Sequence, residues 1–255
     1  MIQARVIPAL LLKGQGLVKT VKFKDPKYLG DPINVVRIFN EKEVDEIVLL
    51  DITATPENRG PQFDVLKDIA SEAFIPLAYG GGIRNMDDVN TLLGIGIEKL
   101  ILNTSSVENP SLVRDIADHA GSQAVVVSID VKKNILGKYE VLTRCGQKKT
   151  GLDPVKHAME MERIGAGEIL INSIDRDGTM QGYDIELVKK VADAVSIPVV
   201  ACGGAGNLAH VGEVIKQGHA SAAAAGSIFV FQGPLRGVLI SYPARKELKK
   251  LLENV

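Results

Sequence analysis

The chain has 255 residues, of which 45% are hydrophobic and 24% are charged, as in ordinary folded domains and unlike fibrous or disordered chains. Its 30 lysines and arginines and 31 acidic residues leave a net charge of −1, so no overall basic field attracts a nucleic acid or an anionic membrane. Two cysteines and no membrane-length apolar run suit a cytoplasmic protein without nucleic-acid or membrane partners.

Eight short apolar runs alternate with amphipathic stretches along the chain. Runs without polar alternation are typical of strands buried on both faces of a parallel sheet. Eight strand–helix units in 255 residues favour an α/β fold with a single (β/α)8 TIM barrel over residues 1–255. A doubly wound sheet is the alternative, but it rarely needs eight such even units. The predicted strands are Val6–Leu12, Ile47–Leu50, Ile75–Tyr79, Leu100–Leu102, Ala124–Ile129, Ile169–Ile171, Ile197–Ala201 and Ala222–Ala225.

Helix starts are indicated between these runs. A capping residue precedes a proline at Asp31-Pro32, Asn109-Pro110 and Asp153-Pro154, which predicts that a helix begins at each proline. Asp184 and Asn207 are further candidate caps, and the chain ends in a helical pattern after Pro234.

An internal repeat predicts two half-barrels of four units each. IPLAYGGGIRN (75–85) and IPVVACGGAGN (197–207) lie 122 residues apart, and the same spacing relates Glu46 to Glu168. A spacing of 119 residues aligns VIPALLLK (6–13) with VVVSIDVK (125–132), which places Leu11 opposite Asp130.

Glycines after the strands predict two phosphate sites for a phosphorylated small molecule. Function in this fold lies at the carboxyl ends of the strands. Glycine amides and helix N-termini bind oxyanions there, although the glycines could also serve only as tight turns. One predicted cradle contains Gly82, Asn103 and Thr104, and the other contains Gly203, Gly204, Gly226 and Ser227.

Carboxylates and lysines at the same rim are further candidates. Asp51, Asp130 and Asp177 could serve as acids or bases, whereas we expect Asp175 to cap the next helix. Residues 13–30 are long for a connecting loop and predict a mobile lid that brings Lys19 over a bound phosphate.

Metal chemistry is not indicated by the histidines or cysteines. The four histidines fall in helices or at helix ends, where surface positions are expected. Without metal-ligand spacing among histidines and cysteines, the sequence predicts no metal site. Cys202 is expected to be an apolar strand-end residue because no histidine is placed to activate it.

Six motifs give the chain a specific resemblance to HisF, the cyclase subunit of imidazole glycerol phosphate synthase. They are LDITA (50–54), GGGIR (80–84), GSQAVVVSID (121–130), GAGEIL (165–170), SIDRDGT (173–179) and GGAGN (203–207). The resemblance implies a barrel that docks a HisH glutaminase at its amino-terminal face. It conducts ammonia to a bisphosphorylated substrate at the other face, with no cofactor. Asp130 is implied as a catalytic residue, and Asp177 and Gly178 as substrate-binding residues.

The family's ammonia gate is a ring of four charged residues at the amino ends of strands. The resemblance assigns this ring to Arg5, Glu46, Lys99 and Glu168, and all four charge types are present. Glu98, beside Lys99, is expected at the docking rim.

Leu11 is the main departure from the family pattern. The family cyclase uses an aspartate at the end of the first strand together with the one at the end of the fifth, and leucine cannot move a proton. LLLK…GLVKT and KFKDPKYLGDP (22–32) resemble instead WbuZ-type paralogues of surface-polysaccharide synthesis. That resemblance implies ammonia supply for amidination of an N-acetyl sugar by an ATP-dependent sugar amidotransferase. The alternatives are a histidine-biosynthesis cyclase (lyase) and a non-catalytic scaffold that activates a glutaminase.

Overall fold

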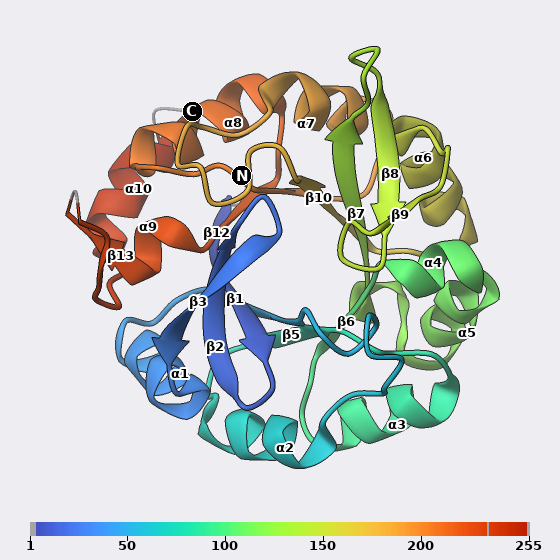
Figure 1. The fold of residues 1–255 in the computed structure, drawn as a ribbon, viewed down its shortest axis with the longest axis horizontal. Coiled ribbons are helices and arrows are strands. Elements are labelled where there is room, and N and C mark those ends of the chain that lie inside the picture. The colour runs from blue at the N-terminus through green and yellow to red at the C-terminus, as the bar shows by residue number, and fades with distance from the viewer. Residues whose placement is uncertain (1–3, 234, 254–255) are drawn as a thin grey trace.

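The computed structural model describes residues 4–233 and 235–253 and shows a closed barrel of eight parallel strands with helices around it (Figure 1). The barrel closes because β1 pairs in parallel with both β4 and β12. All eight apolar runs are confirmed as barrel strands, so the predicted (β/α)8 barrel is confirmed. The barrel strands are β1 (Arg5–Lys13), β4 (Ile47–Asp51), β5 (Leu77–Gly80), β6 (Lys99–Leu102), β7 (Val125–Lys133), β10 (Glu168–Ser173), β11 (Val199–Cys202) and β12 (Ala222–Ala225).

Helices cover the outside of the barrel and bury apolar side chains against the strands. In the part of the chain that the structure describes, no helix is long and apolar enough to cross a membrane. The helices are α1 (Pro32–Glu41), α2 (Phe63–Glu72), α3 (Met86–Gly94), α4 (Thr104–Glu108), α5 (Ser111–Ala120), α6 (Pro154–Ile164), α7 (Ile185–Ala192), α8 (Leu208–Gly218), α9 (Ser227–Val230) and α10 (Arg245–Glu253), with a 3₁₀ turn at Ser122–Ala124.

The inside of the barrel contains a second, smaller apolar cluster. Alternate residues of each strand point inward. Several of them are alanines, whose small side chains fill less of the interior than larger residues would. Together with Leu50 and Cys202, its members are Ile7, Ala9, Val48, Ala78, Ile101, Val126, Leu170, Val200, Ala222 and Ala224.

The internal repeat is visible in the local structure. β5 and β11 occupy equivalent positions, and each leads into a helix capped by an asparagine. Asn85 accepts a hydrogen bond from the Asp88 amide, and Asn207 accepts one from the His210 amide. Equivalent caps at the predicted spacing support the division into two half-barrels.

Most predicted helix starts are confirmed, and one is wrong. Asp31, Asp153, Asp184 and Asn207 cap their helices through side-chain oxygens. Asn109 does not, because it ends the short helix α4, and α5 begins two residues later at Ser111.

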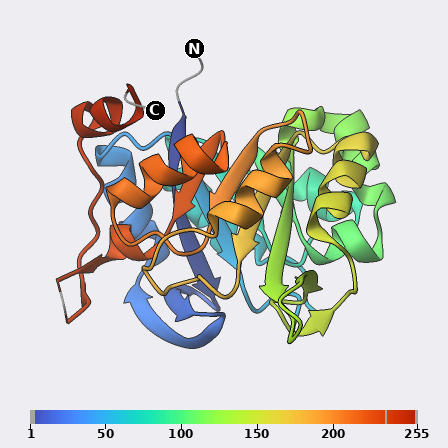
Figure 2. The same cartoon turned by 90° about the horizontal axis from the view of Figure 1, so that it is seen from above.

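Three hairpins extend from the carboxyl end of the barrel (Figure 2). Residues 13–30 were expected to form a loop, but they form β2 (Gly16–Val21) and β3 (Lys24–Gly30), an antiparallel extension of β1. The second hairpin extends β7 through β8 (Tyr139–Thr143) and β9 (Lys148–Lys149), and the third joins β13 (Phe231–Gln232) to β14 (Gly237–Val238).

Candidate functional site

The carboxyl end of the barrel contains a pocket of about 220 Å³. Its walls come from the ends of the barrel strands and the loops that follow them. Every residue predicted for substrate or phosphate binding lines it, and Leu11 lines it too. The predicted binding residues are Lys19, Gly82, Asn103, Thr104, Asp177, Gly178, Gly203, Gly204, Gly226 and Ser227, and the predicted catalytic residue Asp130 lines the pocket with them.

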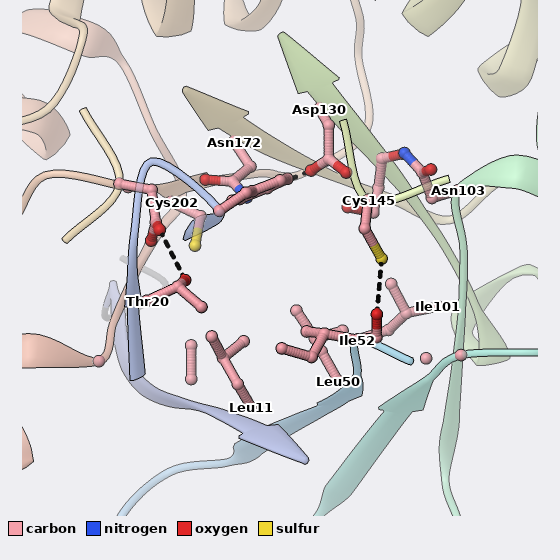
Figure 3. Close-up of a pocket in the computed structure, with 18 of the residues that line it drawn as sticks. Leu11, Thr20, Leu50, Ile52, Ile101, Asn103, Asp130, Cys145, Asn172 and Cys202 are labelled. Atoms are coloured by element: carbon pink, nitrogen blue, oxygen red, sulfur yellow. Dashed lines mark hydrogen bonds between the residues drawn. The ribbon is translucent and has the colours of Figure 1, made fainter. Parts of the chain in front are cut away.

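The pocket has an apolar side and a polar side (Figure 3). Leu11 and Leu50 are register partners on β1 and β4, and Leu50 lies between Leu11 and Ile101 on the apolar side. Asp130 and Asn172 lie across the pocket from them. The leucine at the end of the first barrel strand is therefore part of an apolar wall that faces Asp130.

Asp130 is the buried acid of the polar side. Asn172 Nδ2 donates a hydrogen bond to Asp130 Oδ1 at 3.2 Å, because the two residues are register partners on β10 and β7. Burial, reinforced by the negative charge of Asp177, raises the pKa of Asp130 to about 7 despite the bond from Asn172. Near neutral pH this carboxyl can either donate or accept a proton.

Asn172 was not predicted as a site residue. Its Oδ1 is buried without a hydrogen-bond partner, and a side chain at Gly203 would approach it to 2.7 Å. Its place at the end of a strand, level with Asp130, is the signal that identifies it.

Lys19 lies in the pocket, but not on an irregular lid. It belongs to strand β2, and its Nζ contacts Asp177 Oδ1 at 3.0 Å, with both side chains buried. Thr20 Oγ1 donates to the other oxygen of Asp177 at 3.1 Å. A side chain at Gly226 would approach Lys19 Cε to 3.1 Å, so the lysine lies beside the second predicted cradle.

Both predicted cradles have the backbone that only glycine adopts easily. Gly82 has φ of +72°, Gly203 of +87° and Gly204 of +116°. Asn103 and Gly226 directly precede α4 and α9, and neither helix start has a side-chain cap. The first amides of both helices therefore have no capping side chain that competes for them.

Two rim aspartates have structural roles. Asp51 accepts hydrogen bonds from the Thr53 and Ala54 amides and pairs with Arg59 at 2.9 Å, so it fixes the loop after β4. Asp175 does not cap a helix as predicted, because the Lys133 amide donates to it at 3.0 Å and Asp184 is the cap.

Neither cysteine is a nucleophile in this environment. Burial raises the pKa of Cys145 and of Cys202 to about 12, so both remain thiols. Cys145 reaches the pocket from the second hairpin, where its Sγ donates to the Ile52 carbonyl at 3.1 Å. The expectation that all histidines are at the surface is wrong for His157, which is buried with Nε2 3.4 Å from Ser106 Oγ. Burial lowers the pKa of His157.

The four predicted gate residues form a closed ring at the amino end of the barrel. Arg5 pairs with both Glu46 and Glu168. Lys99 Nζ lies 2.9 Å from a carboxylate oxygen of each of the same two glutamates. Two cations and two buried anions therefore alternate around the barrel bottom. Glu98 is exposed beside this ring.

Within residues 4–233 and 235–253, no group of three or more histidines, cysteines or acids is placed to hold a metal ion. Among the described residues, the pocket chemistry rests on the Asp130 carboxyl, the pair of Lys19 with Asp177 and the glycine amides.

Sequence comparison identifies the family. The sequence model of a family described as histidine biosynthesis protein matches residues 5–235. A Pseudomonas aeruginosa relative, named "Putative imidazole glycerol phosphate synthase subunit hisF2", is 50% identical over 243 residues, covering 95% of this chain and 97% of that protein. The chain belongs to the HisF family.

Other HisF-family relatives are similar over nearly the whole chain. An Alkaliphilus metalliredigens protein, named as imidazole glycerol phosphate synthase subunit HisF, is 47% identical over 229 residues, or 90% of this chain and 91% of that protein. A Leptospira interrogans relative, also named as a HisF subunit with the qualifier "Putative", is 46% identical over 255 residues, or 98% of this chain and 99% of its own. The resemblance drawn from the motifs is thereby confirmed at the level of the family.

Proposed function

We propose that this HisF-family chain receives ammonia from a HisH-like glutaminase at its amino end and conducts it to the carboxyl pocket. There the ammonia supplies an ATP-dependent amidotransferase that amidinates an N-acetyl sugar for surface-polysaccharide synthesis. The observation that carries the proposal is the combination of a complete charged ring at one end with an incomplete acid–base pair at the other.

Burying the four charged residues of the ring at the amino end of the barrel costs free energy, which calls for a functional reason. Burying charges loses hydration that pairing only partly restores, and a ring with one charge lost would leave another unpaired. All four charges are nevertheless kept and paired. A ring that seals the barrel bottom until a glutaminase docks gives a reason to retain them.

The barrel interior suits a small neutral molecule. Between the ring and the pocket, the inward side chains are apolar, and Ala9, Ala78, Ala222 and Ala224 are small. Ammonia is small and uncharged, whereas ammonium would lose its hydration in such an environment.

The pocket supports ammonia transfer better than cyclisation. Cyclisation in the family uses an acid and a base, and Leu11 supplies neither. Leu50 and Ile101 make the wall around Leu11 apolar, so no neighbouring group of that wall replaces the carboxylate.

A cyclase of histidine biosynthesis is the second candidate. Two separate glycine cradles in one pocket favour a ligand with two phosphates, and the named relatives are imidazole glycerol phosphate synthase subunits. The contiguous pyrophosphate of a nucleotide-sugar would fill only one cradle. In this reading Asp130 works with a substitute base. The third candidate, a non-catalytic scaffold that only activates a glutaminase, predicts binding without any ammonia transfer.

Reconstitution with purified partners tests the proposal. The chain is mixed with the HisH-like glutaminase and the ATP-dependent sugar amidotransferase of the same organism, and sugar amidination is followed by mass spectrometry. We expect a complex at micromolar concentrations, faster glutamine hydrolysis and glutamine-dependent amidination. Cyclisation of the histidine-pathway substrate at a family-like rate would favour the second candidate. Activated hydrolysis without either product would favour the scaffold.

A further inference from the structure

The three hairpins all extend from the carboxyl end of the barrel, where the pocket opens (Figure 2). We call residues 13–30, 131–149, 231–233 and 235–239 the mouth rim. A side chain at Gly146 would approach the Phe23 ring to 3.2 Å, so the first two hairpins touch. Lys27 Nζ lies 5.4 Å from the centre of the Phe231 ring, which joins the first hairpin to the third.

The mouth rim is strongly basic although the whole chain has a net charge of −1. Residues 13–30 and 131–149 contain eleven of the 30 lysines and arginines but only two of the 31 acidic residues, Asp25 and Glu140. Lys19 is buried against Asp177, and Glu108 pairs with Arg144 and Lys148. Lysines such as Lys22, Lys24 and Lys138 are exposed, so the outer surface of the rim is positive.

The same rim exposes large apolar side chains. Tyr28 is 66% exposed, Ile135 fully exposed, Leu136 77% and Leu235 95%, while Val21, Val238 and Leu239 add to them. Most of the large hydrophobic side chains exposed in the described residues lie on this rim. Soluble monomers rarely expose so many large apolar side chains at one end of the molecule unless a partner covers them.

The tip of the second hairpin is a fixed turn. The Asn134 amide donates to the Lys138 carbonyl at 2.9 Å, and Asn134 Oδ1 accepts from the Leu136 amide at 2.9 Å and the Lys138 amide at 3.1 Å. Ile135 and Leu136 are therefore held out into solvent by an ordered turn. An ordered turn loses little conformational freedom when it binds a partner.

We propose that the mouth rim is the docking surface for the enzyme that consumes the ammonia, a protein with an acidic face that has apolar recesses. This inference rests on the proposed function. Ammonia released into neutral water is mostly protonated and then no longer a nucleophile, so the acceptor enzyme has to cover the exit of the barrel. The lysines select an acidic face, and the projecting apolar side chains supply its buried contacts.

An anionic membrane is the other surface that a basic and apolar rim could bind. The shape of the rim favours a protein, because the hairpins project beyond the pocket at the strand ends (Figure 2). A flat bilayer that rests on the hairpins could not reach into that pocket. A membrane also contains no acceptor site for ammonia.

The test compares a rim variant with a matched control in the complete system. Ile135→Asp with Lys138→Glu changes one exposed apolar residue and one exposed lysine at the turn, leaving the backbone bonds of Asn134 intact. Met159→Asp with Lys156→Glu makes the same changes on the outer face of α6, where Met159 is 50% exposed. The dissociation constant for the sugar amidotransferase is measured by titration. Glutamine-dependent amidination and glutaminase binding are measured with the same preparations.

We expect the rim variant to bind the amidotransferase at least about tenfold more weakly and to lose glutamine-dependent amidination, with normal glutaminase binding. The α6 control should behave as wild type. Equal binding by both variants, with wild-type amidination intact, would overturn the docking inference and leave the proposed function standing. Absence of amidination by the wild-type system would overturn both. Rim-dependent binding to phosphatidylglycerol-containing vesicles, without amidotransferase binding, would assign the rim to a membrane instead.

Discussion

Replacing Asp130 by asparagine should stabilise the protein at alkaline pH. Asp130 is buried, and its pKa is raised from 3.8 to about 7. Because the carboxyl has a higher pKa in the folded state, the folded protein holds the proton more tightly than the unfolded chain does. The free energy of unfolding is therefore highest below the unfolded-state pKa and falls as the pH rises to the folded-state pKa. The difference between the two values corresponds to about 4 kcal/mol at pH well above 7. Asparagine keeps the shape and the acceptor for Asn172 Nδ2 but has no proton to lose.

Urea unfolding of the wild type and Asp130→Asn at several pH values measures this effect. Other ionisable groups are common to both proteins, so the difference in unfolding free energy isolates Asp130. Part of the decrease in the wild-type unfolding free energy has already occurred at pH 5. We therefore expect the unfolding free energy of Asp130→Asn, relative to the wild type, to increase by about 3 kcal/mol between pH 5 and pH 8.5. An advantage that does not change with pH would refute the assignment of Asp130 as a buried acid that titrates near neutrality.

Three further predictions concern the pocket. The wild type should cyclise the histidine-pathway substrate with ammonium salts about 10²–10⁴-fold more slowly than an intact acid–base pair allows, and Leu11→Asp should recover part of that rate; fast wild-type turnover would contradict this. Lys19→Met should lower the unfolding free energy by about 3–5 kcal/mol because it leaves Asp177 buried without its cation, and Lys19→Met with Asp177→Asn should recover much of the loss. Gly204→Ala should weaken phosphate binding, measured by calorimetry, and cost about 2 kcal/mol or more, because its φ is +116° and a Cβ would meet the backbone. Gly94→Ala, with open space around its Cβ, is the control and should be neutral.

The barrel and most of the pocket could be predicted from local sequence patterns. Apolar runs buried on both faces give a strong signal for barrel strands, and the glycine pairs after β5 and β11 have the positive φ that glycine adopts easily. The ring residues follow from their place at strand starts together with the family motifs.

The first hairpin was missed because it lacks the alternation of an antiparallel pair. In β2, the four consecutive residues Leu17 to Thr20 are all buried, so no alternation marks the strand. Pro26 and frequent charges in the following strand resemble a loop. The pairing with β1, rather than local propensity, makes these residues strands.

The errors at Asp175 and His157 have different causes. The bond from the Lys133 amide to Asp175 joins the end of β7 to the loop after β10, far apart in the sequence, so no local pattern contains it. His157 could have been placed correctly, because Pro154, His157, Ala158 and Met161 share the helical spacing of one buried face. The position of His157 on this buried face, rather than its polar side chain, determines its burial.

The most direct test of ammonia conduction is an isotope competition in the complete complex. Glutamine with heavy nitrogen in its amide is supplied together with excess unlabelled ammonium chloride, and the nitrogen of the amidinated sugar is analysed by mass spectrometry. A conducting barrel predicts that nearly all product nitrogen is heavy. Lys99→Ala, which removes one cation of the ring, should let glutamine hydrolysis continue while the heavy fraction falls. Product nitrogen that matches the bulk ammonium pool in the wild-type complex would contradict conduction through the barrel.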